Sequence, residues 1–280
     1  MPLRFYLYIV CSIFYFGFSG QLIGRNNHAR CPKVLSQIVE TDRLDTLKRF
    51  LNGKSTLVIF DIDNTLVIPY DLIGTEEWFM RLLESKMKEG ASFIEAKKQI
   101  LPLYYEVHNC ISVKFTEPDI NSLFKFLIKK NIPYIALTAR SDIFKQCSNR
   151  QLTEVGLKLP FKGLEQYHIR AQFENPVEFD EGVIYCGSSD KGEVLFYMLD
   201  KICFKPENII FVDDKVSNLL DVQRVCLKRK IPFIGLRYSK LDDNGYIVDL
   251  DKSDQELKKL LGYTTSESIV LAQKKYGPIY

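Results

Sequence analysis

Short apolar runs recur along the chain, and several have the length of a buried strand. They are Leu57–Phe60, Ile132–Leu137, Val183–Cys186, Ile209–Val212 and Ile231–Leu236. Stretches with the apolar spacing of a helix lie between them, and Ile120–Ile128 and Val216–Leu227 are the clearest. Strands that alternate with helices are typical of βαβ units and a parallel sheet. The pattern therefore predicts an α/β fold.

A long insertion interrupts this alternation after the first apolar run. From about Ile68 to Thr116, apolar residues recur at helical spacing, and Thr75 is placed to cap the first helix. Because the insertion directly follows the polar end of that run, we expect a helical cap that covers a site there and limits the size of a substrate. The alternative is that its helices belong to the core of the main domain.

Two other segments have a less regular pattern. Between about Lys162 and Asp190, the stretches His168–Phe173 and Val177–Val183 resemble a hairpin. Apolar residues over Val34–Leu51 have helical spacing, which predicts a helix before the first strand.

The N-terminal residues differ from the rest of the chain. Arg4 precedes an apolar run over Phe5–Phe18, and the small residue Ser19 follows it. A secretory signal has this layout, with an apolar core of about 7–15 residues, whereas a membrane-spanning helix needs roughly 20. We expect residues 1–19 to be a signal peptide and the chain to be exported, to the periplasm or beyond. An uncleaved anchor and a buried N-terminal segment are the alternatives.

Charge and cysteine content limit the partners. The formal net charge is only +3 over 280 residues, so nucleic acid is not an expected partner. Of the seven cysteines, the six outside the N-terminal apolar run permit disulfides in an oxidising compartment. No two are spaced as CxxC, which leaves a zinc site without support. Cys203 and Cys226 fall on apolar helical faces and fit core positions.

The three histidines have no motif context and fit surface or core roles better than catalysis; they are His28, His108 and His168.

Two aspartates directly follow the first apolar run. Asp61 and Asp63 are separated by one residue, and Thr65 comes after them. Carboxylates at the end of a buried strand cost free energy unless a cation meets them, and that end of a parallel strand is where ligands bind. The pair therefore fits a metal-bound nucleophile and an acid/base partner. A polar exit from a strand into a turn is the alternative.

Three later segments place further polar groups beside apolar runs. Thr138 ends the second run, where its hydroxyl and the following amides can donate hydrogen bonds to a phosphate oxygen. Lys191 begins a predicted helix, where the helix dipole disfavours a cation, so pairing with an anionic substrate and with the carboxylate of the nucleophile explains it better. Asp213 and Asp214 end the fourth run, and carboxylates are ligands that Mg²⁺ accepts.

In this order the four segments resemble the motifs of the haloacid dehalogenase superfamily of phosphohydrolases, over residues 55–238. Within it, the chain resembles exported bacterial acid phosphatases and uncharacterised relatives. The resemblance implies a doubly wound parallel sheet with a small helical cap. It also implies that Asp61 is a nucleophile that forms an aspartyl-phosphate and that Asp63 is the general acid/base. Thr138 would then bind a phosphoryl oxygen, and Lys191 would neutralise charge.

The same resemblance implies a Mg²⁺ site. Asp213 and Asp214 would hold the ion together with Asp61 and the backbone carbonyl of Ile62, and the carboxylate of Asp63 belongs to the same candidate set. An acid at position 63 suits ester hydrolysis, because it can protonate a leaving alkoxide and then activate water.

The sequence as a whole predicts a Mg²⁺-dependent phosphomonoesterase that acts on a small phosphorylated molecule. A phosphotransferase or phosphomutase with the same nucleophile is one alternative, and a non-catalytic binding or host-interaction protein on this scaffold is another. The membrane would be a partner only through an uncleaved N-terminal signal. The expected domains are the signal peptide at 1–19, a core at 25–67 and 117–240, the cap at 68–116 and an extension at 241–280. The sequence leaves the role of the extension and the oligomeric state open.

Overall fold

The computed structural model describes residues 35–51, 55–159, 163–164, 166–242, 248–277 and 279. All of them belong to one compact unit, Val34–Tyr280, which is distinct from Met1–Lys33. The expected signal peptide therefore lies outside the described residues, as do Cys11, Cys31 and His28. Within the described part of the chain, no helix is long and apolar enough to cross a membrane.

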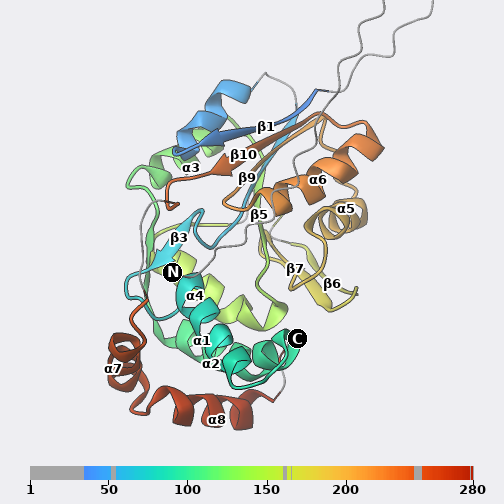
Figure 1. Cartoon of the computed structure of the whole chain (residues 1–280). Helices are drawn as coiled ribbons and strands as arrows, with labels where there is room; N and C mark the ends of the chain where they lie inside the picture. The colour runs from blue at the N-terminus through green and yellow to red at the C-terminus, as the bar shows by residue number, and fades with distance from the viewer. Residues whose placement is uncertain are drawn as a thin grey trace, which may run out of the picture. The chain divides into compact units, whose positions relative to one another are not determined.

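An eight-stranded sheet forms the centre of this unit (Figure 1). Its strands along the chain are β1 (Ser36–Thr41), β2 (Thr56–Phe60), β5 (Tyr134–Thr138), β6 (His168–Gln172), β7 (Pro176–Asp180), β8 (Val183–Tyr185), β9 (Asn208–Asp213) and β10 (Phe233–Tyr238). In space they follow the order β1-β10-β9-β2-β5-β8-β7-β6. The strands from β1 to β8 in that order pair in parallel, and the predicted hairpin, β6 and β7, extends the sheet in antiparallel fashion.

The chain winds in both directions from β2, as the resemblance implied. It passes first to β5 and β8 on one side, and then crosses to β9 and β10 on the other. The winding therefore reverses between β2 and β9. In open α/β sheets, ligands bind outside the carboxyl ends of the strands at this switch point.

Helices cover both faces of the parallel part, which explains why its strands are continuous apolar runs. The helices are α3 (Ile120–Lys129) and α4 (Lys145–Glu154) on one face, and α5 (Lys191–Lys201) and α6 (Val216–Arg229) on the other. Successive residues of β2 point to opposite faces. Val58 and Phe60 belong to the apolar cluster with α3 and α4, and Leu57 and Ile59 to the cluster with α5 and α6.

The prediction of a helix over Val34–Leu51 is wrong for most of that range. Ser36–Thr41 forms β1, which pairs with β10, and only Leu44–Phe50 is helical, as the 3-10 helix η1. Ile38 and Val39 are β-branched and favour a strand. The edge of β10 supplies the pairing partner for that strand. The spacing of apolar residues within 34–51 contains no information about this distant partner.

The insertion after β2 is helical, as predicted. Its elements are β3 (Val67–Pro69), α1 (Glu76–Lys88), α2 (Phe93–Cys110) and β4 (Val113–Phe115), of which β3 and β4 pair to form an antiparallel stem. Thr75 caps α1, since its hydroxyl accepts a hydrogen bond from the backbone N–H of Trp78. Ser92 and Glu95 form a capping box at the start of α2.

The C-terminal residues pack on the same insertion. Helices α7 (Leu250–Leu261) and α8 (Thr265–Tyr276) lie against α1 and α2 (Figure 1). Leu257 of α7 and Ile269 of α8 share an apolar cluster with Trp78 and Leu103. The segment 241–280, which had no assigned role, therefore contributes to the apolar core of the helical layer.

The described cysteines are all free thiols: Cys110, Cys147, Cys186, Cys203 and Cys226. Cys226 is buried in the core, as predicted. Cys203 is instead exposed, and it follows the end of α5 in the left-handed region at φ 54°.

Candidate active site

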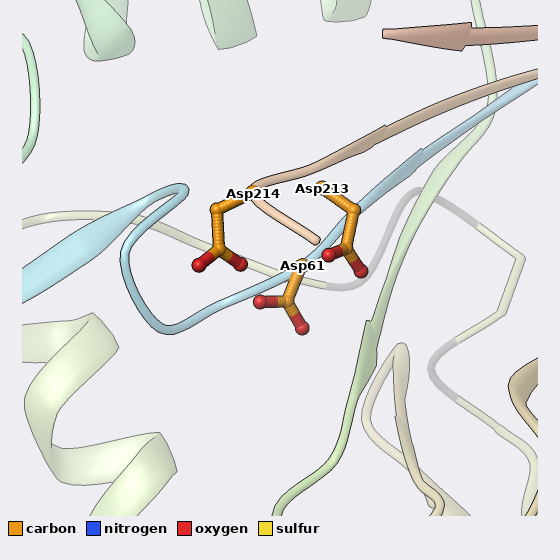
Figure 2. Close-up of side chains that lie close together, drawn as sticks. All are labelled: Asp61, Asp213 and Asp214. Atoms are coloured by element: carbon orange, nitrogen blue, oxygen red, sulfur yellow. The ribbon is translucent and has the colours of Figure 1, made fainter. Parts of the chain in front are cut away.

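Three neighbouring parallel strands end at the same edge of the sheet with polar side chains. Asp61 directly follows β2, Thr138 ends β5 and Asp213 ends β9. Asp214 comes next, and a carboxylate oxygen from each of the three aspartates lies within 4.8 Å of the others. Figure 2 shows these three side chains converging from the ends of β2 and β9. The sheet thus brings together acids that lie some 150 residues apart in the sequence (213 − 61 = 152).

A tight turn carries the chain from Asp61 into the stem of the insertion. Asn64 adopts the left-handed conformation at φ 59°, which Asn tolerates better than most residues. The carbonyl oxygen of Ile62 accepts the backbone N–H groups of Leu66 at 2.9 Å and Val67 at 3.0 Å. Both of its lone pairs are engaged in the turn, and the role expected for this carbonyl as a metal ligand stays a prediction.

Lys191 joins two of the acids. It is the first residue of α5 and only 3% exposed, and its Nζ donates to Asp61 Oδ1 at 2.7 Å and to Asp213 Oδ2 at 2.8 Å. Burial alone would lower the pKa of this lysine, but the two carboxylates raise it above its ordinary value, so the amine stays charged. The sequence-based pairing of Lys191 with the Asp61 carboxylate agrees with this geometry.

Both carboxylate oxygens of Asp213 are engaged in hydrogen bonds with neighbouring residues. It is fully buried, and besides Lys191 it accepts the backbone N–H of Lys215 at 2.8 Å and the amide of Asn218 at 3.0 Å on each oxygen. These bonds use the lone pairs of both oxygens. Asp61 and Asp214 differ, because both line a cavity of about 390 Å³. Neither Asp61 Oδ2 nor the Asp214 carboxylate accepts a hydrogen bond within the described part of the chain.

The acidic cluster fits a divalent cation. Three carboxylates meet one buried ammonium group, so negative charge is in excess. Burial, and then the neighbouring acids, raise the pKa of Asp61, and they raise that of Asp214 to about 7. A cation bound here would neutralise the excess negative charge of the buried carboxylates, and hard ions such as Mg²⁺ prefer carboxylate oxygens. Asp61 and Asp214 offer free oxygens to it, with Asp213 behind them.

Asp63 is turned toward a different partner. Its two oxygens accept a fork of hydrogen bonds from Arg140, from Nε at 2.8 Å and from Nη2 at 2.7 Å. Burial would raise the pKa of Asp63, but Arg140 outweighs it and holds the pKa at about 2. The carboxylate of Asp63 therefore does not join the acidic cluster as a metal ligand here, although it lines the same cavity.

Arg140 was missed by sequence reasoning, and it is the centre of a buried polar network. Its Nη1 donates to Ser148 at 2.8 Å and to Gln151 at 2.9 Å. The Gln151 amide donates to the backbone carbonyl of His108 in α2, and His108 Nε2 lies 3.0 Å from the carbonyl of Gly74. The position of Arg140, two residues after Thr138, was the available signal. His108 is a buried structural residue, as expected, and His168 is exposed and pairs with Asp180.

Thr138 is buried and lines the cavity. Its hydroxyl oxygen accepts the backbone N–H of Arg140 at 3.1 Å, which leaves its own O–H proton free to donate. Its role in binding a phosphoryl oxygen stays a prediction.

The cap and the core meet beside the acids. Glu76, the first residue of α1, accepts from Lys215 Nζ at 2.6 Å and from the Asn64 amide at 3.3 Å. Lys215 and Asn218 are further site residues that the sequence did not single out; both follow the Asp213–Asp214 pair. The cap thus forms part of the wall of the cavity.

The fold and this site define a doubly wound α/β protein that resembles the haloacid dehalogenase-like hydrolases. The chain belongs to the family described as "Protein of unknown function (DUF2608)", whose profile matches residues 35–269.

Two similar proteins come from chlamydiae, and both carry the name "Putative outer membrane protein". The one from Chlamydia trachomatis is 24% identical over 243 residues, which cover 86% of this chain and 89% of that protein. The one from Chlamydia muridarum is 25% identical over 219 residues and covers 78% and 82%.

Solved structures that are similar to the chain include a haloacid dehalogenase-like family hydrolase from Streptococcus pneumoniae. It is 17% identical with a TM-score of 0.39, and the match covers 69% of this chain and 98% of that one. A structure named "putative beta-phosphoglucomutase" from Thermotoga maritima is 16% identical with a TM-score of 0.37, and the match covers 69% of this chain and 100% of that one.

Proposed function

We propose that this protein is a Mg²⁺-dependent phosphomonoesterase that acts through an aspartyl-phosphate on Asp61. One observation carries the proposal. Lys191 holds Asp61 by one oxygen, at 2.7 Å, while the other oxygen lies free in a cavity at the switch point of the sheet. A buried carboxylate held in this way is oriented and desolvated for attack on phosphorus.

The residues around Asp61 divide the remaining work. The free O–H of Thr138 and the ammonium of Lys191 face the charge of a phosphoryl group bound above Asp61. Asp61 and Asp214 would hold Mg²⁺, which supplies positive charge against the phosphoryl oxygens.

In the first step the bond from Asp61 oxygen to phosphorus forms, the ester P–O bond breaks, and the leaving oxygen takes a proton. In the second, water attacks phosphorus, and the P–O bond to Asp61 breaks to release inorganic phosphate.

Asp63 would move these protons, because its carboxylate lines the same cavity as Asp61. With its pKa held at about 2 by Arg140, it is a carboxylate at neutral pH, which is the form that accepts the proton of the attacking water. To protonate the leaving oxygen in the first step, Asp63 must first give up part of the fork to Arg140 and take up a proton from solvent. The water that attacks in the second step then returns a proton to the Asp63 carboxylate.

Two observations support export of the chain. The chlamydial relatives carry the name "Putative outer membrane protein", and residues 1–19 have the layout of a secretory signal. We propose that the chain is exported. Fractionation of a native-like host tests this, since recovery of chain with intact Met1 in the cytoplasmic fraction contradicts it.

The experiment compares the full chain with Asp61→Asn, Asp63→Asn and Asp71→Asn. Asp71 is exposed and outside the site, so its variant controls for loss of one charge. With p-nitrophenyl phosphate, Asp61→Asn should lose about 10⁴-fold or more in kcat and form no phosphoenzyme. Asp63→Asn should still be phosphorylated by this activated ester, but the adduct should persist and be detected on Asp61 by mass spectrometry.

Chelation and readdition of Mg²⁺ complete the test. Activity should disappear with chelator and return with Mg²⁺, and inorganic phosphate should be the product, which separates hydrolysis from phosphotransfer. Substantial Mg²⁺-dependent activity in Asp61→Asn, or an adduct on another residue, refutes the proposal.

A further inference from the structure

The cavity above Asp61 has two unlike walls. The core side presents charged and polar groups, among them Thr138, Lys191 and Asp214. The cap side presents mainly apolar side chains: Phe79, Met80, Leu83, Phe93 and Leu101. The volume of about 390 Å³ lies at the small end of the range for small-molecule sites, about 300–1,000 Å³.

One face of α2 supplies much of the apolar wall. Phe93, Lys97, Leu101 and Tyr104 recur three or four residues apart, so they lie along one side of the helix, and all four line the cavity. Tyr104 packs against Phe79 of α1, with ring centroids 4.7 Å apart, and against Phe144 of the core at 6.1 Å. The aromatic part of the wall is therefore preformed and braced from both sides.

The wall leaves apolar surface uncovered. Phe93 is 50% exposed and Met80 is 41% exposed, although both belong to helices with well-packed apolar faces. Exposed apolar groups that line a cavity mark a place where an apolar ligand is desolvated. The polar atoms of the cap side come from Glu76, Lys97 and Tyr104, and Glu76 is already engaged with Lys215.

We propose that this wall is a binding subsite for an aromatic ring, so that the substrates are small phosphate monoesters with an aromatic organic part. The inference rests on the proposed phosphatase function and names its substrate class. A polyol phosphate suits the wall poorly, because hydroxyl groups placed against Phe79, Met80 and Phe93 lose their hydrogen bonds to water without replacement. A ring loses nothing there and gains contact with the apolar side chains.

The test uses two esters whose leaving groups are both alkoxides, benzyl phosphate and glycerol phosphate, with the full chain and Mg²⁺. Their similar leaving groups keep intrinsic reactivity from masking ring binding. Burial of one phenyl group should favour benzyl phosphate in kcat/KM by about tenfold to a hundredfold. A ratio near one, or a preference for glycerol phosphate, overturns the proposal.

Matched variants locate the subsite. Phe93→Ala and Met80→Ala should reduce the ratio several-fold, and both remove exposed side chains, so folding should be retained. Ile94→Ala and Met87→Ala are the controls, because these residues are 65% and 44% exposed on the same helices but do not line the cavity. Equal changes in the controls overturn the assignment to this wall.

A binding measurement separates this proposal from the proposed function. If neither ester is hydrolysed, the phosphatase function fails, and calorimetry with benzylphosphonate and methylphosphonate then decides on the subsite. Benzylphosphonate should bind about tenfold more tightly or better, and Phe93→Ala should reduce this advantage. Equal affinities for the two phosphonates overturn the subsite.

Discussion

Gly192 controls how closely α5 approaches α6, and through that contact the placement of Lys191. A Cβ atom added at Gly192 would lie 2.3 Å from the backbone carbonyl oxygen of Asp221 and 2.7 Å from the carbonyl carbon. An ordinary C···O contact is about 3.3 Å or longer, so the two helices must separate by about 1 Å. The nearest atoms belong to the backbone of α6 and cannot rotate away.

Two opposing effects determine how much Gly192→Ala changes the free energy of unfolding. Ala is favoured over Gly within a helix by up to about 1 kcal/mol, which alone would make Gly192→Ala more stable. Overpacking of this kind costs typically about 1–3 kcal/mol and more where backbone must move. We therefore expect the free energy of unfolding to fall by about 1–3 kcal/mol.

The same shift should affect catalysis. Lys191 precedes Gly192, and its bonds of 2.7 Å and 2.8 Å to Asp61 and Asp213 do not survive a displacement of 1 Å in the wrong direction. We expect kcat to fall by at least tenfold at temperatures where the variant is fully folded.

Urea unfolding followed by circular dichroism, together with phosphatase assays at 25 °C, measures both effects. Lys201→Ala, at the exposed end of α5, is the control for a change elsewhere on the helix. A Gly192→Ala variant as stable as the wild type, or more stable, refutes the reasoning, because helix propensity would then have decided the outcome.

Two other predictions concern the buried polar network. Arg140→Met should lower the free energy of unfolding by about 3 kcal/mol, the low end for a broken buried pair because the side chain of Asp63 is 36% exposed. Adding Asp63→Asn should recover part of this loss, and a double-mutant cycle with no coupling would contradict the pairing. Burial, aided by Arg140, lowers the pKa of His108 to about 4, so the unfolded chain, with a His pKa of about 6.5, binds a proton more readily. Stability from this group is present above about pH 6.5 and falls by about 3 kcal/mol toward pH 4. His108→Gln should flatten that part of the pH dependence in urea unfolding, and an unchanged slope would count against the assignment.

The local pattern was sufficient for strands β2, β5, β8, β9 and β10 and for helices α3, α5 and α6. β2 and β9 are buried on both faces, so each is a continuous apolar run that ends where the polar chemistry begins. The resemblance added the order of the motifs, and the pairing of Lys191 with Asp61 followed from the cost of placing a lone cation at a helix N-terminus. These features are visible locally because burial and helix electrostatics act on adjacent residues.

Contacts between distant segments decided the rest. β1 is a strand because β10 offers it an open edge, and α7 and α8 join the cap because their apolar faces match those of α1 and α2. Tertiary contacts also determine which partner each of the acids has. Asp63 turns to Arg140 and Asp213 turns to Lys191 and Asn218, which leaves Asp61 and Asp214 facing the cavity. A sequence shows which residues can carry charge, but hydrogen-bond partners that lie 77 or 130 residues away set where each charge points.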